Sequence, residues 1–208
     1  DVRLVDLPPQ FGLDLQLLRT DIQEIPPPPA PSADAPAVVI LDSGLATGHP
    51  LLAPAVGDSQ SFLLGLDASD ENGHGSHVAG LALYGDIEGA IRDRGFTPQL
   101  WLFSGRILDA QNENATGFVE NQIEDAVRYF HEEYGCRVFN LAFGDRNKPY
   151  DGRHLRGLAF TVDRLSRELG ILFVVSAGNV LPGQQDGLAW KNDYPQYLVS
   201  EAWAIIDP

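Results

Sequence analysis

Short apolar runs alternate along the chain with longer stretches in which apolar residues recur at helical spacing. Four runs are largely apolar and rich in β-branched or aromatic residues, as is typical of strands buried on both faces: Ala37–Leu41, Leu100–Phe103, Arg137–Phe143 and Ile171–Val175. Apolar stripes predict helices over 118–134 and 154–169, and a glycine follows each. Strands alternating with helices predict an α/β fold, with a mostly parallel sheet covered by helices in a three-layer αβα arrangement.

The first 36 residues do not follow this pattern. Residues 25–31 read IPPPPAP, a run that enters neither a helix nor a central strand and is typical of a semi-rigid extended spacer. We therefore interpret 1–36 as an N-terminal extension with a proline-rich linker, and 37–208 as the folded domain. A ligand for an SH3-type module is the alternative for the proline run.

Composition excludes several classes of partner. Lys and Arg total 14 against 29 for Asp and Glu, so the formal net charge is −15. A general basic surface for nucleic acid is excluded, and an anionic membrane would repel the chain. No apolar run reaches the roughly 18 residues that a spanning helix needs. We expect neither nucleic acid nor membrane as a partner.

Three further features concern compartment and completeness. Cys136 is the sole cysteine, so an internal disulfide cannot form, and a cytoplasmic location is slightly favoured. No charged-then-apolar leader opens the chain, and methionine is absent even from position 1. We expect a piece of a longer polypeptide, with flanking domains of the same chain as candidate partners.

Candidate chemistry clusters where predicted strands end, the edge at which parallel sheets collect functional residues. Asp42-Ser43-Gly44 follows the first strand, and Ser176–Asn179 follows the fourth. Between them, Asn72–Gly80 reads NGHGSHVAG and opens an apolar segment that predicts a buried helix. The first and last clusters also have a simpler interpretation as a turn or a helix cap, and a histidine is more commonly a surface or hydrogen-bonded core residue.

The histidine cluster permits other chemistry. His74 and His77 stand three positions apart and, with Asp70 or Asp42, are the ligand types of a metal hydrolase. A glycine-rich turn before a helix also suits a phosphate, but the glycine spacing does not match the dinucleotide-binding fingerprint.

Taken together, the clusters resemble the subtilisin-like (S8) serine peptidases. Residues 39–45 read VILDSGL around Asp42, and 48–52 read GHPLL, similar to the family's HP-x-L turn. The histidine motif is close to the family's H-G-T-H-V-A-G, with Ser76 in place of threonine. The match makes His74, not His77, the family's catalytic histidine. The resemblance covers roughly residues 36–208.

The resemblance implies a role for each motif. Asp42 would orient His74, His74 would act as general base and acid, and Asn179 would donate to the oxyanion. The family's substrates are polypeptides, and two segments would flank the pocket for a substrate side chain: Ala142, Phe143 and Gly144, and Ser176, Ala177 and Gly178. Gly117 is a weaker candidate for the edge that pairs with substrate. Calcium sites are common in the family, but we identify no ligand cluster and expect no cofactor.

One departure from the family pattern is decisive. The family's nucleophile lies in a G-T-S-x-A motif after the asparagine, and the 29 residues that follow Asn179 contain none. We expect the subtilisin-like domain to be incomplete at its C-terminus, with the serine beyond residue 208 and this chain inactive alone. A catalytically inactive subtilase-like binding or regulatory domain remains an alternative, as does the metal hydrolase.

Overall fold

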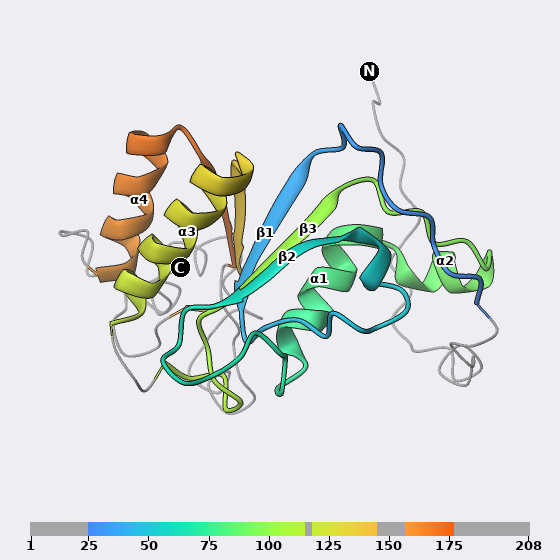
Figure 1. The fold of residues 1–208 in the computed structure, drawn as a ribbon, viewed down its shortest axis with the longest axis horizontal. Coiled ribbons are helices and arrows are strands. Elements are labelled where there is room, and N and C mark those ends of the chain that lie inside the picture. Colours follow the sequence, from blue (N-terminus) through green and yellow to red (C-terminus); the bar gives the residue numbers. More distant parts are fainter. Residues whose placement is uncertain (1–24, 115–117, 145–156, 177–208) are drawn as a thin grey trace, which may run out of the picture.

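The computed structural model describes residues 25–114, 118–144 and 157–176, and within them five strands form one parallel sheet (Figure 1). The order is β2-β3-β1-β4-β5, and each neighbouring pair is parallel. The strands are β1 Ala37–Asp42, β2 Val56–Ser61, β3 Trp101–Arg106, β4 Val138–Leu141 and β5 Leu172–Val175. The predicted mostly parallel α/β sheet is confirmed.

Helices lie on both faces of this sheet. They are α1 His74–Tyr84, α2 Ile87–Arg92, α3 Val119–Tyr134 and α4 Gly157–Leu169, with a short 3₁₀ turn at Ala53–Ala55. Figure 1 shows α3 and α4 side by side on one face and α1 on the other. The helices predicted over 118–134 and 154–169 therefore form, the second described from Gly157 onward.

Alternate residues of β1 enter two separate cores, which explains why its sequence is continuously apolar. Val39 and Leu41 belong to the core shared with α3 and α4, whose buried members include Phe130 and Leu165. Val38 and Ile40 belong to the core beneath α1, with Ala79 and Leu83 of that helix. A central strand that is buried on both faces has no solvent-facing position, so polar residues do not alternate with apolar ones along it.

The last strand of the described sheet, β5, departs from the expectation of burial on both faces. Phe173 and Val175 pack against the core of α3 and α4, whereas Leu172 and Val174 are 58% and 47% exposed. The strand pairs with β4 on one side and packs its apolar residues against helices on one face. Its continuous apolar run therefore does not reflect burial on both faces within the described residues.

Residues 25–36, which we call the strap, lie against the domain with one side buried. Ile25, Pro28 and Pro31 are buried, while Pro26, Pro27 and Pro29 between them are exposed. Burial every third residue matches the three-residue turn of an extended polyproline helix. Trp101 fixes the strap to β3 through its indole N–H, which donates to the Ser32 carbonyl at 2.9 Å. Figure 1 shows the strap running beside residues 93–100 toward α2.

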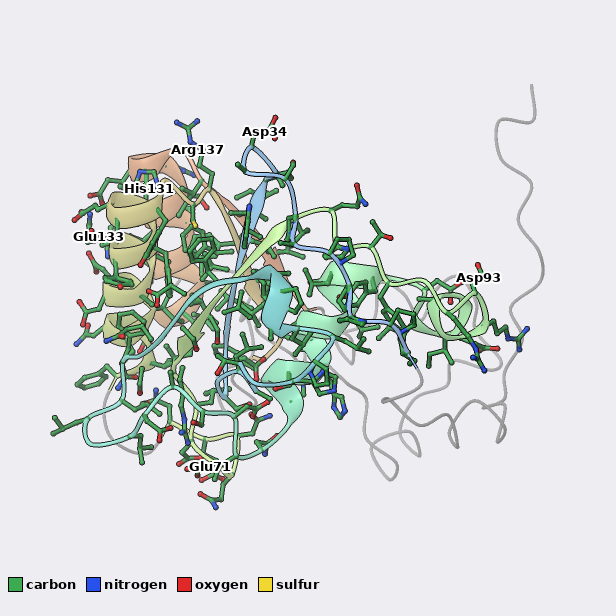
Figure 2. The ribbon with its side chains drawn as sticks, turned by 45° about the vertical axis from the view of Figure 1, so that its right-hand side comes forward. Asp34, Glu71, Asp93, His131, Glu133 and Arg137 are labelled. Carbon is green, nitrogen blue, oxygen red and sulfur yellow. The ribbon has the colours of Figure 1, made fainter. Side chains whose placement is uncertain are left out.

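Because the strands are parallel, their carboxyl ends share one edge of the sheet. Asp42 ends β1, and it lies in register with Arg106 at the end of β3. In Figure 2, Glu71 lies at one end of the molecule, and Asp34 and Arg137 lie at the opposite end. Among the described helices, none combines the length and apolar character needed to cross a bilayer.

Candidate active site

Asp42 and His74 meet at the carboxyl edge of the sheet. The Nδ1 atom of His74 lies 2.8 Å from one carboxylate oxygen of Asp42 and 3.0 Å from the other. Asp42 ends a central strand and is buried, while the His74 side chain is 38% exposed. The sheet thus supplies a fixed, desolvated carboxylate, and the first residue of α1 supplies an imidazole that solvent reaches.

The contact determines which nitrogen of His74 carries the proton. An ionised carboxylate only accepts hydrogen bonds, so the Nδ1 atom is the donor to Asp42. In neutral imidazole the lone pair then resides on Nε2, which becomes available as a proton acceptor. Asp42 also accepts a hydrogen bond from the Ser43 amide at 2.8 Å, which holds the carboxylate in place. This arrangement is suited to general acid–base catalysis.

Helix α1 begins without a capping side chain of its own. Its N-cap residue is Gly73, whose φ of 93° lies in the left-handed region that glycine adopts readily. The first amide groups of the helix find partners outside it. The His74 amide donates to the Asn72 side chain at 3.3 Å, the Gly75 amide to the Ser43 hydroxyl at 3.1 Å, and the Ser76 amide to Asp70 at 2.8 Å.

Asp70 accepts hydrogen bonds on both carboxylate oxygens. One oxygen accepts from the Ser43 hydroxyl at 2.9 Å and from the amides of Asn72 and Gly73 at 3.2 and 2.7 Å. The other accepts from the amide and the hydroxyl of Ser76 at 2.8 and 2.6 Å. Burial works to raise the pKa of Asp70, but the hydrogen bonds from Ser76, Gly73 and Ser43 outweigh it and hold the pKa below its usual value. Asp70 is therefore ionised at neutral pH.

A buried arginine anchors the loop that carries Asp70. Arg106 is fully buried, and its guanidinium donates to the carbonyls of Asp67 at 3.1 Å and Ser69 at 2.9 Å. The carboxylates of Asp67 and Glu71 lie 3.7 and 3.5 Å from it and offset its charge. The loop is also joined to the turn after β1, because the Leu45 amide donates to the Ala68 carbonyl at 3.1 Å.

The ends of β4 and β5 lie side by side where the two predicted pocket segments begin. The Ser176 amide donates to the Leu141 carbonyl at 3.0 Å, which puts Ser176 next to the strand end that leads into Ala142 and Gly144. Phe143 is partly buried and packs against the core of α3 and α4, so its ring contributes to that core. Substrate contact by these residues stays a prediction.

The remaining predicted site residues fall into two groups. Gly117, Ala177, Gly178 and Asn179 lie outside the described residues. His77 is exposed on α1, one turn beyond His74. Within the described ranges, no group of three or more His, Cys, Asp or Glu side chains is arranged to hold a metal ion.

Sequence reasoning missed the supporting residues of this site. The sequence alone indicates Ser43 only as part of a turn and Asp70 only as an alternative metal ligand, and it suggests no role for Arg106. Arg106 lies three residues beyond the predicted run Leu100–Phe103, after the small residues Ser104 and Gly105, and ends the observed strand β3. An arginine so close to a buried strand is a usable signal because a buried cation needs partners. Asp70 offers a weaker signal, since an aspartate three residues before a glycine N-cap is also common in ordinary loops.

Comparison with known proteins bears on the family of the chain. The model of the subtilase family matches residues 33–198. The chain is 27% identical over 158 residues to "Subtilisin" of a Bacillus species, covering 71% of this chain and 34% of that protein. It is 30% identical over 143 residues to "Thermostable alkaline protease" of Halalkalibacterium halodurans, covering 68% of this chain and 35% of that protein. An uncharacterised protein of Sinorhizobium fredii is 33% identical over 89 residues, 42% of this chain and 21% of that protein.

A solved structure supports the same fold. The crystal structure of a cold adapted subtilisin-like serine proteinase matches with a TM-score of 0.50 and 20% identity, over 69% of this chain and 46% of that one. The family match spans well over half of the chain, so the chain belongs to the subtilase family. It spans about a third or less of the length of the curated relatives it matches.

Proposed function

We propose that this chain is the part of a serine endopeptidase domain that carries the aspartate and the histidine of an Asp–His–Ser triad. The nucleophilic serine is contributed by sequence that follows residue 208. The observation that carries the proposal is the hydrogen bond of 2.8 Å between His74 Nδ1 and the buried Asp42 carboxylate. It leaves Nε2 as a base on a half-exposed ring at the edge of a parallel sheet.

The mechanism follows from this pair. Nε2 of His74 takes the proton of the attacking serine and later returns it to the leaving amine. Asp42 stabilises the imidazolium that forms in between. Asn179 donates through its side-chain amide to the tetrahedral oxyanion, an effect of about 3–4 kcal/mol in such sites.

The substrate is a polypeptide. The segments Ala142–Gly144 and Ser176–Gly178 flank the pocket for a substrate side chain, and the adjacency of Ser176 to the end of β4 supports this assignment. Gly117 lies in the segment that we assign to backbone pairing with the substrate, in the manner of strand addition.

The test compares two histidines of one helix. In the protein that carries this chain, we expect Asp42→Asn to lower kcat for a peptide substrate by about 10⁴-fold, and His74→Ala to lower it by at least as much. His77→Ala is the matched control, because His77 is exposed on the same helix and lies outside the proposed machinery, and it leaves kcat unchanged. A serine-directed phosphonate labels a serine outside residues 1–208, and the 208-residue chain alone hydrolyses nothing.

Two results would contradict this proposal in different ways. Loss of activity in His77→Ala together with inhibition by a chelator indicates the metal hydrolase. Absence of both hydrolysis and phosphonate labelling in the intact protein indicates a subtilase-like binding or regulatory domain.

A further inference from the structure

The two catalytic side chains of the proposed peptidase sit on separate elements. Asp42 ends β1, whereas His74 begins α1, and 32 positions of sequence separate them. Their hydrogen bond therefore depends on how the first turn of α1 is held against the turn that follows β1. The direct contact between His74 and Asp42 involves one nitrogen of His74, the Nδ1 atom. Helix ends fray unless their amides are satisfied.

A single carboxylate joins those two turns. Asp70 bonds to Ser43, the residue directly after Asp42, and to Gly73 and Ser76, which stand on either side of His74. The Ser43 hydroxyl donates to Asp70 and accepts from the Gly75 amide, so it closes a ring of bonds around the catalytic pair. The Ser76 hydroxyl extends the ring by accepting from the Ala46 amide at 2.9 Å.

The acceptor capacity of Asp70 is already used. A carboxylate offers about four lone-pair positions, and Asp70 accepts five hydrogen bonds within the described residues. It thus has no position free for a reacting group. Its negative charge at the start of α1 also interacts favourably with the helix dipole.

We propose that Asp70 is a positioning residue that caps α1 from outside the helix and so fixes His74 Nδ1 against Asp42. This rests on the proposed peptidase function for its effect on rate, but its effect on geometry is independent of it. Arg106 supports the same arrangement from behind by binding the carbonyls just ahead of Asp70.

The chain offers a matched control for this proposal. Asp86 is the N-cap of α2, and its side chain accepts from the Gly89 amide at 2.9 Å. Asp86→Ala therefore removes an aspartate that, like Asp70, accepts from a first-turn amide, in a helix that does not carry His74. Any general effect of losing a cap is common to Asp86→Ala and Asp70→Ala.

The first readout is kinetic and uses the protein that carries this chain. Asp70→Ala lowers kcat by about 10- to 100-fold with KM unchanged, because displacement of a catalytic group by about 1 Å costs up to that much and Asp70 does not touch substrate. Asp70→Asn retains one oxygen that can accept from the Ser43 hydroxyl, so we expect it to lower kcat by less than Asp70→Ala does. Asp86→Ala stays within about twofold of the parent.

The second readout does not require activity. In protein labelled with ¹⁵N-histidine, the proton on His74 Nδ1 gives a low-field resonance while it is bonded to Asp42, assigned by its loss in His74→Gln. We expect this resonance to be lost or moved in Asp70→Ala and retained in Asp86→Ala. If the parent protein hydrolyses no peptide, the proposed function fails, and this readout still decides the role of Asp70.

A second variant covers the case in which Asp70→Ala does not fold. Ser76→Ala removes one donor to Asp70 and the acceptor for the Ala46 amide, whereas Ser76→Thr retains the hydroxyl. We expect Ser76→Ala to lower kcat and shift the resonance, and Ser76→Thr to restore both. The proposal is overturned if Asp70→Ala, or Ser76→Ala in its place, matches Asp86→Ala in kcat and in the His74 resonance.

Discussion

Replacing Gly75 by alanine adds a methyl group where the structure has no room for one. A Cβ atom at Gly75 would lie 2.2 Å from the Gly44 carbonyl oxygen and 3.3 Å from the Cβ of Asp42. The obstructing atom is backbone, so it cannot rotate aside as a flexible side chain would. The first turn of α1 must therefore move away from the turn that follows β1.

The size of the movement follows from the distances. Real Cβ contacts essentially never fall under 3.0 Å, so α1 must retreat by at least 3.0 minus 2.2, or about 0.8 Å. Added to the 2.8 Å between His74 Nδ1 and Asp42, this gives about 3.6 Å, which is no longer a hydrogen bond. Overpacking of this kind costs about 1–3 kcal/mol, and the better helix propensity of alanine returns at most about 1 kcal/mol.

The same helix contains a control. A Cβ at Gly80 would meet only the Cδ1 atom of Ile87 at 3.7 Å, an ordinary contact. Gly80→Ala should raise the free energy of unfolding by about 0.5–1 kcal/mol, because alanine loses less backbone entropy on folding. In urea unfolding, the midpoint of Gly75→Ala should therefore lie below that of the parent and the midpoint of Gly80→Ala above it. The free energy of unfolding of Gly75→Ala should be about 2 kcal/mol lower than that of Gly80→Ala.

In the active protein, Gly75→Ala should also lower kcat by up to about 10²-fold, while Gly80→Ala should leave it unchanged. Equal unfolding midpoints for the two variants would refute the reasoning, since they would show that the turn after β1 yields to the added methyl without cost.

Two further predictions concern groups away from the site. Glu124 on α3 bonds to Arg164 of α4 and to Arg128 of its own helix, and these bonds lower its pKa from 4.5. Because the folded pKa is the lower one, the stabilisation is present above pH 4.5 and is lost as pH falls through the lowered value. Glu124→Gln should therefore lower the free energy of unfolding by about 0.5 kcal/mol at pH 7, by less in 1 M salt and hardly at all in acid. The control is Asp163→Asn, which removes a more exposed ion pair and should lower the free energy of unfolding by less. A loss of stability in Glu124→Gln that does not depend on pH would contradict this prediction. Cys136 is buried, and burial raises the pKa of its thiol to about 11, so a thiol reagent at pH 8 should label it only at the rate at which the protein opens. Labelling that is fast in native buffer and insensitive to urea would argue against a packed Cys136.

The sheet was largely predictable because its central strands bury both faces. Continuous apolar runs mark β1 and β3, and the stripes of α3 and α4 face a single core. Strand β2 was not predicted because its sequence, VGDSQS, contains one large apolar residue. Within the described residues it pairs only with β3. Gly57 within it lies under the ring of Phe103, an environment that its own sequence does not reveal.

The sequence predicted the two residues of the central contact, Asp42 and His74, but not the residues that hold them in place. Asp42 and His74 stand at element ends, where the strand-end rule directs attention. Ser43 bonds to Asp70 and Gly75, and Arg106 bonds to Asp67 and Ser69, across 27 to 39 positions of sequence. No local pattern encodes which distant hydroxyl a loop carboxylate will reach, so these roles required the three-dimensional arrangement.

The capping of α1 by residues outside the helix also affects the order in which the protein folds. An isolated helix of 11 residues is marginal in water, and this one begins at a glycine that contributes no capping side chain. Its first amides are satisfied through Ser43 and Asp70, so its amino-terminal turn gains stability only after β1 and the 67–73 loop have docked. The pairing of His74 with Asp42 thus belongs to the cooperative, long-range stage of folding, and a partly folded chain does not possess it. In the proposed peptidase, this would couple the acquisition of a working base to completion of the sheet.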